Sequence, residues 1–461
     1  MLEPICHSVL FTDLYELTMA AAYFENRFEA DASFELFVRS LPPGRGYLLA
    51  AGLEQVLDYL EALHFTAEEI DYLRRHPMFR HVSAEFFDYL KQLRFTGEIW
   101  GMPEGTPVFG GEPLLRVSAP IVEAQIVETY LLAVVTFETM VATKAARLVE
   151  AAQGRGVVDF GTRRAHGPEA GLLAARAAYI GGCTGTSNVE AGLRFGIPTY
   201  GTVAHSFIMA HEREEDAFRN FARLFPETTI LLVDTYDTLH AIDKIIAMKM
   251  HPRGVRLDSG NMAELAKQVR ERLDEAGLRD TRIFASGDLD EFSITRLLAQ
   301  GAPVDVFAVG TALVTSSDAP ALGGVYKMVE LHGRQSAADT PTLLPRYTAK
   351  FSPEKATYPG TKQVFRFADA HGCYARDLVA CAGEKHAGAE PLLERVMQKG
   401  RRTQSAPKLD VVRERVRNSL PRVPAAVREL HHPAPYPVRV SEQLQQLLDE
   451  VRTGIGLRRA S

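Results

Sequence analysis

The sequence predicts an α/β protein whose central part is a barrel of parallel strands. Between Val157 and Val329, short runs rich in β-branched residues alternate with helical stretches, as in VVDFG followed by PEAGLLAARAAYIGG. Strands that alternate with helices of this length are typical of parallel βαβ units. About seven or eight such units fit this stretch, which favours a closed or nearly closed barrel. A doubly wound open sheet is the alternative.

The segments before the barrel mix helical and extended patterns. LEQVLDYLEAL (53–63) has the spacing of an amphipathic helix, FELFVRSL (34–41) is an extended segment, and PPGRGY (42–47) is a turn. From about Ile121 a long amphipathic helix is expected to run to Gln153, and Gly154 suits its C-terminal cap. This helix marks the start of a new domain.

The barrel strands are expected in order along the chain. After VVDFG they are IPTYGTV, TILLVD, GVRLD, RIFAS, VDVFAV and finally GGVYKMV. Beyond Val329 the regular alternation fades, and residues 384–407 are expected at the surface. SEQLQQLLDEVRTGIG (441–456) predicts a last amphipathic helix.

The composition excludes several classes of protein. The 461 residues are 46% hydrophobic and 24% charged, which is an ordinary globular mixture. Because 52 Lys and Arg stand against 58 Asp and Glu, the net charge of −6 offers no excess of positive charge for nucleic acid. The four cysteines are scattered, and neither a secretory leader nor a membrane-spanning run is evident. We therefore expect a cytoplasmic protein that binds neither nucleic acid nor membranes.

Polar residues gather directly after the predicted strands, where the loops of a barrel converge. Each of them singly is often a turn former, a helix cap or a solvated charge. Glycine beside hydroxyl and acid, as in DSG, SGD and VGT, is nevertheless typical of backbone amides that receive phosphate. The residues after successive strands are Thr162, Arg163, Arg164 and His166; Thr202, His205 and Ser206; Asp234 and Thr235; Arg256, Asp258 and Ser259; Ser286, Asp288 and Asp290; and Gly310 and Thr311.

These residue types indicate a heavily phosphorylated small substrate. Arg163, Arg164 and Arg256 can grip anionic oxygens with two hydrogen bonds each. Asp258 and Asp288 can hold Mg²⁺ through water, although the metal ligands stay unassigned.

His205 follows a predicted strand in GTVAHSFIMAH. A lone histidine is more often packed or solvated than catalytic. A metal site is disfavoured, because the spacing between His205 and His211 does not place them on one helical face and no third ligand is evident nearby. Since no GxSxG motif or Cys–His pair competes with it, His205 is predicted to be a catalytic nucleophile.

Taken together, several motifs resemble those of the nicotinate phosphoribosyltransferase family. In chain order they are FTDLYELTMAAAYFE, VVDFGTRRAHGPEAG, GTVAHSF, LLVDTYDT, GVRLDSG, ASGDLDE, VGTALVT, GGVYKMV and KFSPEKATYPGTKQVFR. The resemblance implies the type II phosphoribosyltransferase architecture. In that architecture an irregular TIM-like α/β barrel (121–332) accompanies a second α+β domain formed from both chain ends (1–120 and 333–461).

The same resemblance implies an activity. Nicotinate would condense with phosphoribosyl pyrophosphate, assisted by ATP hydrolysis, to give nicotinate mononucleotide and pyrophosphate in the salvage route to NAD. It further implies Mg²⁺ as cofactor and a homodimer whose active sites are shared between subunits.

Roles for individual residues also follow from the resemblance. His205 would be phosphorylated by ATP, while Tyr15 of a partner copy and Phe160 would cover the two faces of the pyridine ring. Arg256 and Thr202 would address the substrate carboxylate or the phosphoribosyl group. The remaining assignments are Arg163 to pyrophosphate, Asp258 to the ribose hydroxyls or Mg²⁺, Asp288 to the catalytic set, and Gly287, Gly310 and Thr311 to the 5′-phosphate.

Ser187, in CTGTSN, bears on the choice of base. Relatives that use nicotinamide carry an acid at the position we align with Ser187. A carboxylate about 4 Å from the nicotinate carboxylate would cost roughly 4 kcal/mol at an effective dielectric of about 20, or about a thousandfold in binding. Ser187 therefore favours nicotinate, and the alternatives are a nicotinamide enzyme or a non-catalytic phosphoribosyl-binding protein. Asn261 stands where the family pattern leads us to expect an acid.

Overall fold

The structure, a computed structural model, describes residues 8–333, 345–351 and 357–459. The chain divides into two compact units. One combines both ends of the chain, up to Thr139 and from Ala321 onward, and the other comprises Met140–Pro320. Within the described ranges, no helix is both long and apolar enough to cross a lipid bilayer.

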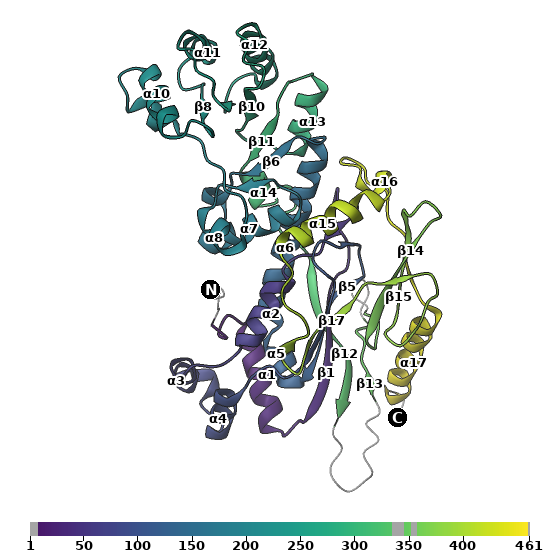
Figure 1. The fold of residues 1–461 in the computed structure, drawn as a ribbon. Helices are drawn as coiled ribbons and strands as arrows, with labels where there is room; N and C mark the ends of the chain where they lie inside the picture. Colours follow the sequence, from purple (N-terminus) through teal and green to yellow (C-terminus); the bar gives the residue numbers. More distant parts are fainter. Residues whose placement is uncertain (1–7, 334–344, 352–356, 460–461) are drawn as a thin grey trace. The chain divides into compact units, whose positions relative to one another are not determined.

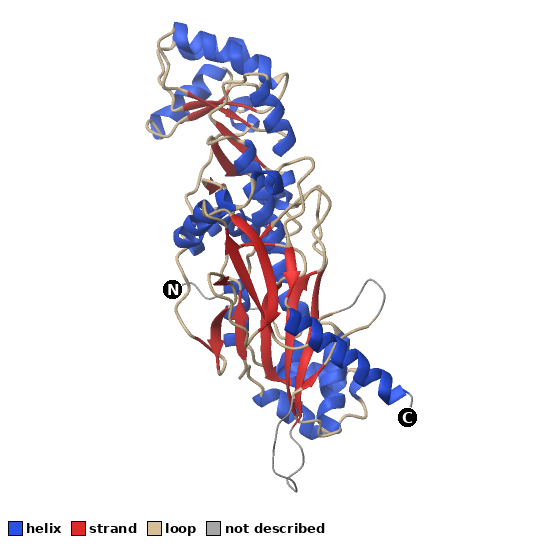
Figure 2. Ribbon diagram, turned by 90° about the vertical axis from the view of Figure 1, so that its right-hand side faces the viewer, coloured by secondary structure: helices blue, strands red, loops and turns tan. Residues whose placement is uncertain are grey.

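A seven-stranded antiparallel sheet forms the centre of the unit built from the chain ends; its long strands are red in Figure 2. The largely buried β1 (Ala30–Val38) pairs with β12 (Gly324–Gly333) on one side and with β5 (Pro113–Pro120) on the other. The sheet therefore joins strands from both ends of the chain. Its other strands are β3 (Glu98–Gly101), β13 (Arg346–Tyr347), β17 (Glu394–Gln398) and β18 (Arg401–Arg402).

Helices and a smaller four-stranded sheet complete this unit. Local sequence explains two of the helix starts, since Thr66 and Glu69 form a capping box before residue 67 and Ser83 caps the helix that begins at residue 84. The helices are α1 (Leu14–Glu25), α2 (Leu53–Ala62), α3 (Ala67–Arg75), α4 (Ala84–Gln92), α5 (Ile121–Ile126), α15 (Leu409–Ser419), α16 (Ala425–Arg428) and α17 (Glu442–Arg459). The smaller sheet contains β16 (Glu390–Pro391), β14 (Lys362–Ala368), β15 (Tyr374–Cys381) and β19 (Val438–Val440), and β2 (Leu48–Leu49) pairs with β4 (Pro107–Val108).

The second unit contains a sheet of six parallel strands that curves as part of an irregular TIM-like barrel, which confirms the predicted fold class. The strand order is β7 (Gly185–Thr186), β6 (Gly156–Asp159), β11 (Val306–Val309), β10 (Arg282–Ala285), β9 (Gly254–Leu257) and β8 (Ile230–Leu232). Its helices, all but α9 labelled in Figure 1, are α7 (Pro168–Ile180), α8 (Val189–Phe195), α9 (His205–Met209), α10 (Glu214–Leu224), α11 (Thr238–Ala247), α12 (Met262–Glu275), α13 (Glu291–Ala299) and α14 (Thr311–Val314). α6 (Glu128–Ala151) runs from the first unit into the second.

The structure corrects the predicted number of barrel strands. IPTYG forms only an isolated bridge between Thr186 and Thr199, and GGVYKMV becomes β12, which pairs with β1 from Gly324 opposite Val38 to Gly333 opposite Ala30. This antiparallel ladder assigns the segment to the unit of the chain ends. As a result the barrel unit begins at Met140 and ends at Pro320, whereas the sequence placed its limits at 121 and 332.

Two smaller expectations also change. The long helix expected from 121 is divided at Val127 into α5 and α6, and Gly154 follows α6 with a φ of +84°. Residues 384–407 are not all at the surface, because β17 pairs with β3 and buries Val396 and Met397. The final amphipathic helix is present as α17.

Candidate active site

Arg256 is the centre of a hydrogen-bonded cluster where the barrel strands end. It is the third residue of β9, and its side chain is only 11% exposed. Nε donates to Ser286 Oγ and Nη1 to Thr202 Oγ1, each at 2.8 Å. Nη2 donates to Asp258 Oδ1, also at 2.8 Å. Because these partners come from separate loops, one guanidinium holds three loops together and is itself fixed in orientation.

Phe160 joins this cluster from the end of β6. The guanidinium carbon of Arg256 lies 5.9 Å from the Phe160 ring centroid, within the range of a cation–π contact. The structure thus brings together Phe160, Thr202, Arg256 and Asp258, four of the residues the sequence singled out. A planar aromatic face beside a fixed cation suits an anionic ring compound.

Buried Asp159 shapes the loop that carries Phe160. Its Oδ1 accepts a hydrogen bond from the Gly161 amide at 2.8 Å, and Oδ2 accepts one from Thr186 Oγ1 at 2.7 Å. Burial raises the pKa of Asp159, and these two bonds oppose the shift. The amide of Ser187 donates to the Asp159 carbonyl at 2.8 Å, which places Ser187 next to the strand end that leads to Phe160.

His205 begins α9 and faces two polar side chains. Its Nδ1 is 3.1 Å from Thr235 Oγ1, and its Nε2 is 3.8 Å from Asp258 Oδ2. The side chain remains 40% exposed, so a ligand can reach it. The Thr235 contact fixes one ring nitrogen and leaves Nε2 on the side of the carboxylate.

Asp258 connects His205 to the arginine cluster. Burial on its own raises the pKa of Asp258, but hydrogen bonds from Ser286 and Arg256 and the Arg256 charge lower it below its ordinary value. The carboxylate is therefore ionised at neutral pH. Asp234 supports the same loop, since its Oδ2 accepts from the Asp258 amide at 3.0 Å and from Ser259 Oγ at 2.7 Å.

Glycines allow the loops after β10 and β11 to approach their neighbours closely. Gly287 has a φ of +86°, and a Cβ on it would lie 2.2 Å from the Asp258 carbonyl oxygen. Gly310 precedes the short helix α14, which Thr311 begins. A Cβ on Gly161 would lie 2.8 Å from the Gly310 carbonyl oxygen, so the loops after β6 and β11 are also in contact. Backbone amides are accordingly available beside the cluster.

Three predicted residues stand outside this network. Arg163 lies exposed in the turn Thr162–Arg164, and Asp288 is exposed with a φ of +32°. Neither makes a side-chain hydrogen bond or ion pair with any part of the chain that the structure describes. Tyr15 belongs to the unit of the chain ends, where it lies in α1 with 48% of its surface exposed. Burial and the charges of Glu128, Glu16 and Asp13 raise the pKa of Tyr15 to about 12.

The carboxylates beside the cluster suit a magnesium ion only in part. In the described ranges, no group of three or more His, Cys, Asp and Glu side chains could hold a metal. Asp234 Oδ1 is, however, buried without a hydrogen-bond partner among described residues, and Asp258 lies beside it. Since Mg²⁺ commonly uses one or two carboxylates together with substrate phosphates, these residues fit an ion that arrives with its substrate. Asn261 is the N-cap of α12, accepting from Glu264, so an acid there is not needed for the fold.

Sequence reasoning gave no role to Asp159 or Asp234, although both end a predicted strand. Ser286 and Thr235 were likewise noted only as residues after strands. The importance of these four residues depends on which loops meet in space. The sequence feature that could have identified them is a polar residue at the end of a buried strand or directly after it.

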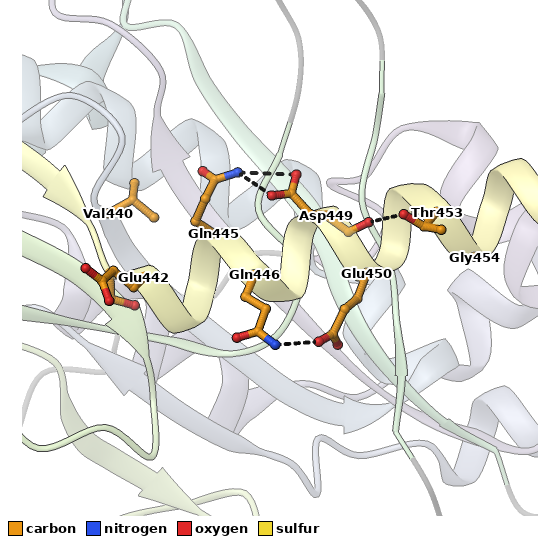
Figure 3. Close-up of a pocket in the computed structure, with 9 residues that line it drawn as sticks. Val440, Glu442, Gln445, Gln446, Asp449, Glu450, Thr453 and Gly454 are labelled. Atoms are coloured by element: carbon orange, nitrogen blue, oxygen red, sulfur yellow. Dashed lines mark hydrogen bonds between the residues drawn. The ribbon is translucent and has the colours of Figure 1, made fainter.

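A pocket along α17 is separate from this cluster (Figure 3). It has a volume of about 910 Å³ and is lined by residues of α17 and the end of β19. Gln446 pairs with Glu450 along the helix, and Gln445 lies within 3.5 Å of Asp449. With no lysine, arginine or histidine in its lining, this pocket does not suit a phosphorylated substrate.

Comparison with known proteins places the fold and the cluster in an enzyme class. Residues 141–319 match the family model "Quinolinate phosphoribosyl transferase, C-terminal domain". The structure resembles that of nicotinate-nucleotide pyrophosphorylase from Pyrococcus furiosus, with a TM-score of 0.71 and 26% identity over 90% of this chain and 95% of that one. The irregular barrel and its match to this family model therefore define a phosphoribosyltransferase.

The rest of the chain identifies the family. Residues 10–136 and 385–448 match the N-terminal and C-terminal domain models of nicotinate phosphoribosyltransferase. Nicotinate phosphoribosyltransferase pncB2 of Mycobacterium tuberculosis is 47% identical over 96% of this chain and 94% of its own length, and the Bacillus subtilis enzyme is 38% identical over 97% and 96%. The crystal structure of human nicotinic acid phosphoribosyltransferase superposes with a TM-score of 0.82 at 29% identity, covering 95% of this chain and 99% of that one. The chain belongs to the nicotinate phosphoribosyltransferase family.

Proposed function

We propose that this protein transfers a phosphoribosyl group from phosphoribosyl pyrophosphate to nicotinate, forming nicotinate mononucleotide and pyrophosphate for NAD synthesis in the cytoplasm. The observation that carries the proposal is the Arg256 cluster, which sets a fixed guanidinium beside the Phe160 ring in a member of this family. The guanidinium and Thr202 bind an anionic group, and the ring supports a planar base.

The loop glycines and cations serve the phosphorylated substrate in this proposal. Amides after β10 and β11, at Gly287, Gly310 and Thr311, receive the 5′-phosphate. Exposed Arg163 turns toward the pyrophosphate when the substrate is present. Asp258 and Asp288 interact with ribose hydroxyls or, through water, with Mg²⁺, which supplies positive charge for the departing pyrophosphate.

In this proposal ATP reacts with His205. Nδ1 is engaged by Thr235 Oγ1, so Nε2 attacks the terminal phosphorus of ATP, forms the N–P bond and releases ADP. Water later breaks the N–P bond and yields phosphate. The negative charge of Asp258, 3.8 Å from Nε2, stabilises the positive charge that the ring acquires as Nε2 bonds to phosphorus.

The active unit in this proposal is a homodimer. Tyr15 of a second copy covers the free face of the pyridine ring opposite Phe160. The exposed position of the Tyr15 side chain in α1 is consistent with such a role.

One assay tests the proposed activity. Purified protein is supplied with phosphoribosyl pyrophosphate, with and without ATP, and with nicotinate, nicotinamide or quinolinate as the base. We expect mononucleotide from nicotinate, faster with ATP, and far less from the other two bases. Equal rates with nicotinamide, or product only from quinolinate, would overturn the proposal.

A labelling experiment tests the histidine step. Radiolabelled ATP should give an acid-labile phosphate on the wild type and on Thr235→Ser, which keeps the hydroxyl. His205→Ala should not be labelled. If His205→Ala is labelled like the wild type, the phosphoryl group resides elsewhere.

A further inference from the structure

A second arginine cluster lies in the unit of the chain ends, around a cavity of about 270 Å³. The cavity is bounded by the end of α15, by β14, β15 and β16, and by the loop before β4. Its lining includes three arginines, Arg366, Arg415 and Arg422. All three lie outside the barrel unit, so the proposed activity gives them no role.

Arg366 is a buried cation with one unused edge. It is 3% exposed, and its Nε and Nη2 donate to Asp377 at distances between 2.6 and 3.1 Å. This bidentate pair balances the charge of Arg366 and fixes its guanidinium plane. Nη1 makes no hydrogen bond with any described residue. Because Arg366 lines the cavity, this nitrogen is available to a ligand there.

Arg422 and Arg366 both lie against the ring of Tyr374. The guanidinium carbons of Arg366 and Arg422 lie 4.6 and 4.4 Å from the Tyr374 centroid. Arg422 Nε donates to the Gly372 carbonyl at 2.8 Å, and both terminal nitrogens of Arg422 make no hydrogen bond with described residues.

Arg415 contributes a third guanidinium from α15. Its Nη1 donates to the Glu104 carbonyl at 2.5 Å, which leaves Nε and Nη2 free of partners in the described part of the chain. Neither Arg415 nor Arg422 forms an ion pair with a described carboxylate. Glu390 and Glu394 also line the cavity, but both are exposed and make no ion pair with a described arginine.

We propose that this cavity is a second binding site, for a free oxyanion of the phosphate class. Free guanidinium edges from Arg366, Arg415 and Arg422 supply charge-assisted donors. Thr106 and Ser419 also line the cavity, but their hydroxyls already donate to the carbonyls of Pro103 and Gly105, so the arginines are the donors for the anion. The volume of about 270 Å³ is below the range usual for sites of drug-sized ligands, which favours a small ion over a nucleotide.

The test uses the intact protein with phosphate and with a heavier analogue. The double variant Arg415→Gln/Arg422→Gln removes both unpaired cations. Arg417→Gln is the matched control, because Arg417 lies on the same helix with 76% of its side chain exposed and pairs with Glu414. Crystals soaked in tungstate should show an anomalous peak in the cavity for the wild type and the control. The double variant should show none there while keeping any peak in the barrel.

Calorimetry with phosphate gives the solution measurement. We expect the wild type and the control to bind phosphate with the same affinity. The double variant should bind it at least tenfold more weakly. Arg415→Lys/Arg422→Lys, which keeps the charges, should retain part of the affinity. Absence of a peak in the wild type, or equal peaks in the double variant, would overturn the proposal. Binding of glycerol phosphate without binding of phosphate would also overturn it, because the site would then recognise a phosphate ester and not the free ion. The rate of nicotinate turnover is measured on the same double variant. Because the barrel activity is read out by turnover and the second site by phosphate binding, failure of one proposal can be told from failure of the other.

Discussion

Arg256 and Asp258, two residues apart on the same strand end, form a 2.8 Å ion pair that connects the arginine cluster to His205. The pair directs the guanidinium toward Phe160 and Thr202 and keeps the Asp258 carboxylate ionised 3.8 Å from the imidazole. In the proposed reaction Arg256 serves nicotinate and phosphoribosyl pyrophosphate, while His205 serves ATP. Both functions therefore depend on the contact between Arg256 and Asp258.

Replacing Arg256 with lysine should disable the site while keeping its charge. An ammonium group cannot reproduce the fork that bridges Ser286, Thr202 and Asp258. We expect kcat/KM for nicotinate to fall by about two to three orders of magnitude, corresponding to roughly 3–4 kcal/mol. Steady-state kinetics check this. Arg253→Lys, an exposed neighbour before β9, is the control, and comparable losses in both variants would contradict the assignment.

The sequence predicts the barrel and most of the strand-end residues because both depend on local patterns. Alternating apolar runs and helices indicate parallel strands, and polar residues after them indicate one edge of a barrel. GGVYKMV shows the limit of this reasoning. Its apolar character suits a barrel strand as well as a strand inside an antiparallel sheet, and only the ladder with β1 decides between them. The roles of Asp159 and Asp234 likewise depend on contacts between loops distant in sequence.

Gly287→Ala should impair, by steric conflict, the loop that is proposed to bind phosphate. The added Cβ would lie 2.2 Å from the Asp258 carbonyl oxygen, so the loop after β10 must move. We expect KM for phosphoribosyl pyrophosphate to rise at least tenfold. Gly277→Ala separates this effect from backbone strain, because Gly277 has a similar φ of +78° but no atom within 4 Å of the added Cβ. If both variants bind the substrate like the wild type, close approach at Gly287 is unimportant for binding.

Ser187→Asp should change the preferred base. A new carboxylate about 4 Å from that of nicotinate costs roughly 4 kcal/mol at an effective dielectric of about 20, while uncharged nicotinamide feels no such repulsion. The ratio of kcat/KM for nicotinate to that for nicotinamide should therefore fall by up to about a thousandfold. Ser187→Ala, which adds no charge, should leave the ratio nearly unchanged. An unaltered ratio in Ser187→Asp would place Ser187 away from the base.

Glu123→Gln should remove a pH dependence from folding. Burial raises the pKa of Glu123 from 4.5 to about 7, against hydrogen bonds from Thr96 that lower it. Because the folded pKa exceeds the unfolded one, the protonated carboxyl favours folding below about pH 4.5, and this contribution is lost as the pH rises through about 7. Over that window the stability of the wild type should fall relative to Glu123→Gln by about 3 kcal/mol. Urea unfolding at several pH values measures the difference, and parallel curves for the two proteins would show that Glu123 does not titrate in this range.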